Sequence, residues 1–221
     1  MKLLIHACCA DCLLKYINSI REKNKKISEI EVYFYNPNIH PRAEYLARLK
    51  AIQKITEENK IKLIVADWSP REWFETLRTS GTSLDPSKAD AFSRAGERET
   101  LKQQNPPVST EVETFSLKKG GSQKIKSRCE GCWNLRLNKT FEYAKNKKFD
   151  LVSSTLITSH YQNSKKIKEI AKDLENEYKI KFLIPKKVSK DLKTSGFYKQ
   201  NYCGCCYSLV EAWEEKFSIK R

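Results

Sequence analysis

Short apolar runs alternate with amphipathic stretches along this chain of 221 residues. Runs rich in β-branched, aromatic and other apolar side chains predict five strands. The predicted strands cover residues 2–6, 31–35, 61–66, 151–155 and 180–184. Apolar residues recur every three or four positions between them, which predicts amphipathic helices. The predicted helices cover residues 13–21, 42–59, 131–146 and 164–178, with shorter ones starting at 70 and covering 209–217. Strands that alternate with helices predict an α/β fold with a parallel sheet.

This pattern is interrupted between residues 79 and 127. The segment contains Pro106-Pro107, Gly120-Gly121 and few large apolar residues, so it has little surface to bury in a core. We expect it to be a flexible polar insertion within one α/β domain that spans residues 1–221, because a chain of this length is short for two full domains.

The chain is strongly basic: 42 Lys and Arg residues face 27 Asp and Glu residues, a formal net charge of +15. This excess predicts attraction to polyanions such as nucleic acid, although lysine-rich solvated faces would give the same composition. Residues 79–127 contribute only +2, from eight basic and six acidic side chains, so the excess lies mainly on the α/β body. No apolar run suits a signal peptide or a membrane span, so we expect a cytoplasmic protein without a membrane partner.

The eight cysteines fall into three groups. The first group is Cys8, Cys9 and Cys12, the second is the CxxC pair Cys129 and Cys132, and the third is Cys203, Cys205 and Cys206. In a reducing compartment such clusters are more often metal ligands or redox groups than structural disulfides. A lone CxxC occurs in zinc sites, in redox pairs that form a disulfide and in iron–sulfur sites, whereas three groups favour a soft-metal centre.

The placement of the first two groups favours catalysis over a structural zinc site. The first group follows a buried strand and precedes a helix, and the second lies at the start of another helix, where open α/β sheets build their sites. The positive end of a helix dipole also stabilises a thiolate. We therefore expect a lowered pKa at Cys12, Cys129 and Cys132.

Other candidate side chains are less specific. His6 ends the first strand, where a histidine is more often a satisfied core residue than a ligand or an acid, and both interpretations stay open. His40 and His160 lie in predicted loops and could meet a phosphate or a substrate hydroxyl. Tyr198 and Tyr202 flank a polar loop and are candidates for stacking on a base, whereas the remaining large aromatic side chains are expected in the core. No phosphate-binding loop follows the first strand, which argues against nucleotide hydrolysis.

Three motifs in order give the chain a family resemblance: Tyr35-Asn36-Pro37-Asn38-Ile39-His40-Pro41, Arg128-Cys129-x-x-Cys132-x-x-Leu135-Arg136-Leu137, and Gln200-Asn201-Tyr202-Cys203-Gly204-Cys205. With the first cysteine group, they resemble the cobalamin-independent epoxyqueuosine reductases of the QueH family over nearly the whole chain. The resemblance implies a fold similar to HUP-type, Rossmann-like nucleotide-binding proteins. It also implies a four-iron four-sulfur cluster with a neighbouring iron, an external electron donor, and the last step of queuosine formation on tRNA.

The chain departs from that family in three places. Asp11 stands where the family has proline in Cys-Cys-Ala-Pro-Cys, which adds an acid or a ligand. The segment from residue 79 to 127 replaces a shorter link before the CxxC. Cys206 is an extra thiol, for which no role is expected.

The resemblance makes Cys8, Cys9, Cys12, Cys129, Cys132, Cys203 and Cys205 the expected metal ligands, and Asp11, Cys12 and His6 the candidates for catalysis. Neighbouring side chains at a strand end point to opposite sides, so we expect Cys8 and Cys9 to serve two adjacent metals. The CxxC pair, with one thiol from Cys8 or Cys9 and one from Cys203 or Cys205, would hold the cluster. The remaining thiols and Cys12 would hold the second iron, with Asp11 as a substitute ligand.

Two other functions stay open on the sequence. A tRNA sulfur-transfer enzyme of the HUP type would need ATP and a phosphate loop, which is missing. A zinc-stabilised RNA-binding module would need the same basic charge and cysteines but no iron. Iron content of the anaerobically purified protein separates these possibilities.

Overall fold

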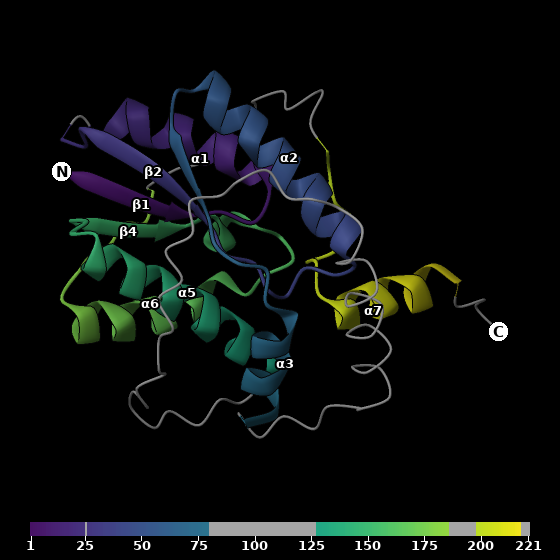
Figure 1. Cartoon of the computed structure of the whole chain (residues 1–221). Helices are drawn as coiled ribbons and strands as arrows, with labels where there is room; N and C mark the ends of the chain where they lie inside the picture. The colour runs from purple at the N-terminus through teal and green to yellow at the C-terminus, as the bar shows by residue number, and fades with distance from the viewer. Residues whose placement is uncertain (25, 80–126, 186–197, 218–221) are drawn as a thin grey trace.

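The computed structural model describes residues 1–24, 26–79, 127–185 and 198–217. Within them, five parallel strands form one sheet in the order β3-β2-β1-β4-β5 (Figure 1). The strands are β1 Lys2–His6, β2 Glu29–Phe34, β3 Lys62–Val65, β4 Leu151–Ser154 and β5 Lys181–Phe182. In the central strand, Ile5 pairs with Val32 of β2 and with Ser153 of β4. The predicted α/β fold with a five-stranded parallel sheet is confirmed.

Helices cover both faces of the sheet, as Figure 1 shows. On one face lie α1 (Ala10–Lys23) and α2 (Arg42–Glu58), and on the other lie α5 (Arg128–Asn146) and α6 (Ser164–Tyr178). Alternation along β1 directs Leu3 and Ile5 into the first of these cores and Leu4 into the second. Each face is therefore apolar, as expected for a parallel sheet that is covered twice.

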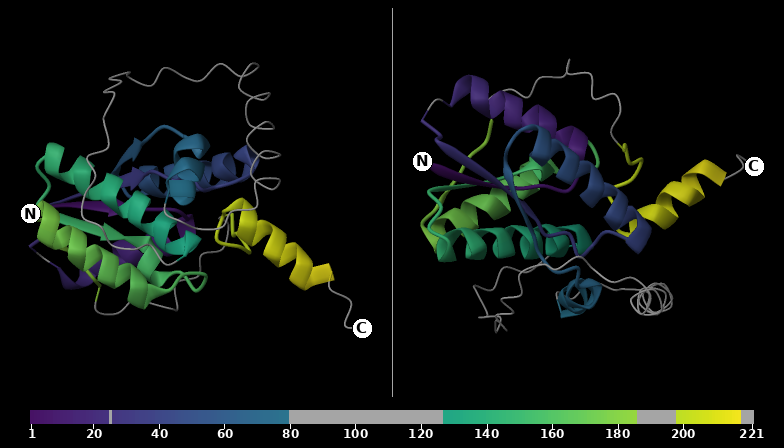
Figure 2. Two further views of the ribbon diagram at one scale, coloured as in Figure 1. Left: turned by 90° about the horizontal axis from the view of Figure 1, so that it is seen from below. Right: turned by 45° about the horizontal axis from the view of Figure 1, so that its top comes forward.

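The remaining helices lie at the carboxyl end of the sheet. They are α3 (Pro70–Thr79), the short η1 (Thr155–Thr158) after β4, and α7 (Cys206–Phe217), which extends away from the body (Figure 2). The strand order reverses direction between β1 and β4, and ligands of open α/β sheets bind at such a point beyond the carboxyl ends of the strands. The fold thus places the site at this edge.

Element boundaries differ from the sequence prediction mainly at the cysteine groups. Helix α5 begins at Arg128, three residues earlier than expected, because Ser127 caps it: the Glu130 N–H donates to Ser127 Oγ at 3.2 Å. Helices α1 and α7 also begin three residues earlier than predicted. The CxxC therefore lies inside the first turn of α5, and Cys206 is the first residue of α7.

The predicted flexible insertion at 79–127 falls, except for its two end residues, outside the described residues. Among the described helices, none combines the length and the apolar character that a bilayer span requires.

Candidate functional site

The first cysteine group lies where β1 passes into α1. Cys8 and Cys9 are buried, with 7% and 1% of their surface exposed, and Cys12 is half-buried in the first turn of α1. The Cys9 thiol interacts with both Cys8 and Cys12. Asp11 accepts a hydrogen bond at 2.9 Å from the Lys15 ammonium, one helical turn later. The loop that ends β1 thus gathers three thiols and one carboxylate.

The third group is held in place by a buried arginine of α2. Arg48 donates to the carbonyl oxygens of Tyr202 and Cys203 at 3.3 Å each, and it is ion-paired with Glu44 at 2.6 Å. Gly204, which lies between Cys203 and Cys205, has φ +113°, a backbone conformation that residues with a Cβ rarely adopt. This bend brings Cys203 Sγ to 3.6 Å from Cys205 Sγ.

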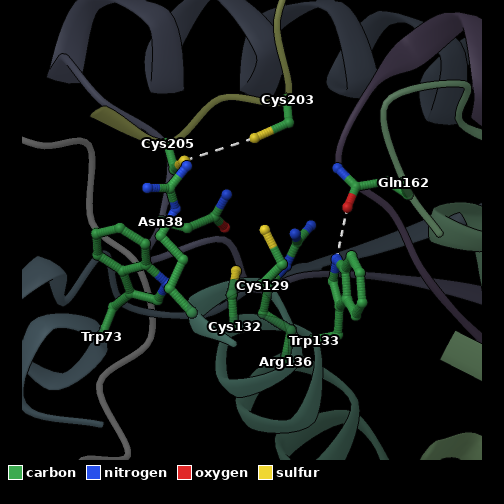
Figure 3. A pocket seen from close by; sticks show the side chains of 10 residues that line it. Asn38, Trp73, Cys129, Cys132, Trp133, Arg136, Gln162, Cys203 and Cys205 are labelled. Atoms are coloured by element: carbon green, nitrogen blue, oxygen red, sulfur yellow. Dashed lines mark hydrogen bonds between the residues drawn. The ribbon is translucent and has the colours of Figure 1, made fainter. Parts of the chain in front are cut away.

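The second and third groups meet in one pocket (Figure 3). Its sulfur-bearing walls are the CxxC pair on α5 and the Cys203–Cys205 pair before α7. The other lining residues are Asn38, Trp73, Arg128, Trp133, Arg136 and Gln162. Trp133 Nε1 donates to Gln162 Oε1, which fixes one wall, and the Trp73 ring forms another. Cysteine groups that are about 70 residues apart in the sequence therefore line the same pocket, whereas the first group is not part of its lining.

Arg136 connects this pocket to the first cysteine group. It lies one helical turn after Cys132, so both side chains share one face of α5. Its guanidinium is 1% exposed, donates to Asn36 Oδ1 at 2.6 Å, and contacts the thiols of both Cys8 and Cys132. Asn36 is in turn anchored because its Nδ2 donates to the Ala7 carbonyl at 2.8 Å. The Arg136 side chain thus lies between the first cysteine group and the pocket and interacts with thiols of both.

The pKa values of the thiols differ from the sequence expectation. Desolvation raises the pKa of Cys129 to about 11, and burial raises the pKa of Cys132. The expected lowering at the start of α5 is therefore wrong, because desolvation outweighs the effect of the helix N-terminus. In the third group, the interaction with the Cys205 thiol lowers the pKa of Cys203 to about 6, and the Ser208 hydroxyl contributes to this shift. The thiolate form is thus best supported at Cys203.

Two of the three candidate histidines, His6 and His40, are core residues. His6 is fully buried; its Nε2 donates to the Tyr35 carbonyl at 3.1 Å, and its Nδ1 lies 2.9 Å from Ser154 Oγ. Burial lowers the pKa of His6 well below its ordinary value. The structure therefore favours the core interpretation and does not bring His6 into the pocket. His40 is 2% exposed among Trp68, Trp73 and Phe74, whereas His160 is exposed.

The two predicted stacking tyrosines differ from each other. Tyr202 is buried, and its hydroxyl donates to the His40 carbonyl at 2.6 Å, so its ring is not a platform for a base. That prediction is wrong for Tyr202 because its ring packs in the core beside Arg48. Tyr198 is 41% exposed, and its hydroxyl donates to Glu44.

The donor set of the pocket fits a thiolate-bound metal cofactor. All eight cysteines are free thiols, and four of them line one pocket. Trp73 Nε1, Arg136 Nε and Asn38 Oδ1 are buried without a hydrogen-bond partner among the described residues, although the Trp73 and Arg136 side chains both face Cys132. Buried N–H groups seldom remain without a partner, and sulfur atoms of a bound centre would provide one. In the described part of the chain, no three or more His, Cys, Asp or Glu side chains already form a metal-binding arrangement.

Sequence reasoning missed the arginines that organise this site. Arg136 carried a usable signal, because a basic residue four positions after Cys132 must share its helix face. Arg48 carried none: nothing local to α2 indicates that its side chain reaches the backbone at residues 202 and 203.

Comparison with known proteins identifies the family. The sequence profile of epoxyqueuosine reductase QueH matches residues 3–89 and 89–211. The chain is 28% identical to epoxyqueuosine reductase QueH of Thermotoga maritima over 232 residues, which cover 99% of this chain and 95% of that protein. It is 27% identical to the protein of that name from Dehalococcoides mccartyi, and the match covers 95% of this chain and 93% of that protein. For the Haemophilus influenzae protein the identity is 26%, with 97% and 75% coverage. A profile match over nearly the whole length shows that this chain belongs to the epoxyqueuosine reductase QueH family.

Proposed function

We propose that this chain reduces the epoxide of epoxyqueuosine in tRNA to the alkene of queuosine, in the cytoplasm. The observation that carries the proposal is the convergence of the second and third cysteine groups on one pocket, with the first group directly behind Arg136. In a member of this family, such a pocket is the natural place for the reduction.

The reaction sets the requirements of the site. Removing the epoxide oxygen to form an alkene consumes two electrons and two protons and releases one molecule of water. Side chains cannot supply these electrons repeatedly, so a redox cofactor and an external donor are needed. We propose a four-iron four-sulfur cluster with a neighbouring iron, which when bound would supply the electrons and a Lewis acid.

The positions of the thiols suggest which residues hold each group. Cys129 and Cys132 line the pocket, and Cys8 contacts Arg136, which also contacts Cys132; these three would hold the cluster with Cys203 or Cys205. Cys9 and Cys12 interact with each other and would hold the second iron together with the remaining thiol of Cys203 or Cys205. Asp11 beside them would act as a further ligand or carry a proton.

The other pocket residues shape the place where substrate binds. Trp73 and Trp133 are buried and form walls that exclude water. Asn38 Oδ1 is buried without a partner among the described residues, so it offers an acceptor to a hydroxyl or an amine of the substrate. The net charge of +15 provides attraction for the tRNA backbone.

Anaerobic purification and reconstitution with iron and sulfide test the proposal. A brown protein with both iron and sulfide that converts epoxyqueuosine in tRNA to a nucleoside lighter by one oxygen atom supports it; the product is measured by mass spectrometry of digested tRNA. Cys206→Ser is the matched thiol control and is expected to convert substrate as the wild type does. A colourless protein that carries zinc would contradict the proposal in favour of an RNA-binding module. ATP-dependent incorporation of sulfur into tRNA would do so in favour of a sulfur-transfer enzyme.

A further inference from the structure

Two arginines are almost completely buried next to the cysteine groups, and only one of them has a carboxylate partner. Arg48 and Arg136 are each 1% exposed. Arg48 is ion-paired with Glu44 at 2.6 Å and donates to two backbone carbonyls. Arg136 has no ion pair with any carboxylate in the described residues, and its guanidinium donates a hydrogen bond to the neutral amide of Asn36. Since a guanidinium stays charged when buried, Arg136 requires negative charge from another source.

The ionisable side chains that interact with Arg136 are three thiols and His6. Its guanidinium contacts the thiols of Cys8 and Cys132, and its charge also reaches Cys203. Its Nε remains a buried donor without a partner among the described residues. Asn36 holds the guanidinium in orientation, because Asn36 is itself anchored to the backbone of Ala7. The side chain is thus held in place with N–H groups turned toward two cysteine groups.

We propose that Arg136 is a positioning residue which provides the shared positive charge and N–H donors for the thiolates of Cys8 and Cys132 when they bind a metal centre. The assignment of that centre to an iron–sulfur cluster rests on the proposed function; the role of Arg136 toward thiolate-bound metal does not. Hydrogen bonds and positive charge at ligand sulfur atoms stabilise the more negative, reduced form of a cluster and raise its reduction potential. Arg136 would therefore ease electron uptake without touching the substrate.

Two substitutions separate this role from a contribution to folding. Arg136→Met removes charge and donors but keeps an apolar side chain of similar length, and replacing a buried charge in this way is often neutral or stabilising for the fold. Arg136→Lys keeps the charge but loses the planar fork. Arg21→Gln is the matched control, since Arg21 lies on α1 and donates to Asn59 away from all the cysteines.

The first measurement uses Co²⁺ on the metal-free, reduced protein and follows the thiolate-to-cobalt charge-transfer absorption. We expect Arg136→Met to weaken Co²⁺ binding by about 10–100-fold, the usual effect of losing a residue that supports metal ligands, while its melting temperature is not lowered. The Co²⁺ affinity of Arg136→Lys should lie between those of Arg136→Met and the wild type, and the affinity of Arg21→Gln should equal that of the wild type. Equal Co²⁺ affinity in Arg136→Met and wild type would overturn the proposal, as would a wild-type protein without thiolate–cobalt absorption.

The second measurement compares reduction midpoints after reconstitution with iron and sulfide. The midpoint of Arg136→Met should be more negative than that of Arg136→Lys, and both should be more negative than wild type. Unchanged midpoints would overturn the role of Arg136 while leaving the reductase assignment intact. If the wild type forms no cluster but Co²⁺ binding still depends on Arg136, the proposed cofactor fails and the role of Arg136 stands.

A double substitution tests the link between the two cysteine groups. Because Arg136 contacts both Cys8 and Cys132, Cys8→Ser should weaken Co²⁺ binding less in the Arg136→Met background than in the wild type. Strict additivity of the two changes would overturn the claim that one side chain serves both groups.

Discussion

Replacement of Gly204 by alanine is expected to displace the third cysteine group. Gly204 has φ +113°, and a Cβ placed there would lie 3.1 Å from Arg48 Nη1 and 3.1 Å from Ile39 Cγ1. Both neighbours are almost completely buried, and Arg48 is held by Glu44 and by the backbone carbonyls of Tyr202 and Cys203. Displacing either the Arg48 or the Ile39 side chain would therefore cost stability.

The cost follows from the backbone conformation. A residue other than glycine in a sparsely populated region costs about 1–3 kcal/mol, and we expect a loss near 2 kcal/mol. For a chain of this size the loss lowers the melting temperature by about 4–8 °C. Because Cys203 and Cys205 flank the strained position, the same substitution should also reduce the iron bound per chain after reconstitution.

Circular dichroism of the reduced, metal-free protein measures the melting temperature, and elemental analysis measures the iron. Lys179→Gly is the converse control. Lys179 caps α6 at φ 59°, where glycine removes the Cβ penalty, so the variant should keep or gain up to about 1 kcal/mol. A Gly204→Ala protein with the melting temperature and the iron content of the wild type would refute this reasoning.

Three further predictions concern acidity, metal ligands and RNA. Burial lowers the pKa of His40 to about 4, so the folded protein keeps it neutral while the unfolded chain protonates it below about 6.5. The free energy of unfolding should therefore fall as the pH decreases from 6.5 to 4, and this residue accounts for about 3 kcal/mol of the fall. Urea titrations at several pH values should show a smaller fall in His40→Gln than in the wild type. An equal dependence of the unfolding free energy on pH in the two proteins would contradict the assignment. Among the cysteines, Cys129→Ser should lose the cluster, Cys12→Ser should lose only the second iron, and Cys206→Ser should keep both. Iron counting and electron paramagnetic resonance measure these losses. A Cys12→Ser protein with full iron content and activity would exclude the proposed ligands. Finally, tRNA binding should weaken linearly on a log–log plot against salt and persist after deletion of residues 82–123, which carry little of the net charge; loss of binding in a folded deletion variant would place the RNA surface elsewhere.

The sequence alone determined the class of the fold and which side chains are available for chemistry. Strand and helix periodicities are local, because each element must present one apolar face to the core, so the five strands and most helices could be read directly. Capping was the main local error: Ser127 starts α5 three residues early, a shift that apolar spacing does not reveal. The three cysteine groups likewise indicated a soft-metal or redox centre before any contact was known.

Only the tertiary structure decided how the site is assembled. The strand order β3-β2-β1-β4-β5 brings the loop after β1 beside the start of α5, and Arg48 holds residues 202–204 against the same pocket. These contacts join positions more than 60 residues apart in the sequence, so no local pattern encodes them. The raised pKa of Cys129 and the burial of Arg136 arise in the same way, since both depend on how neighbouring elements exclude water. Local side-chain pattern thus fixes which groups are available, whereas packing between distant elements fixes which of them meet and in what electrostatic state.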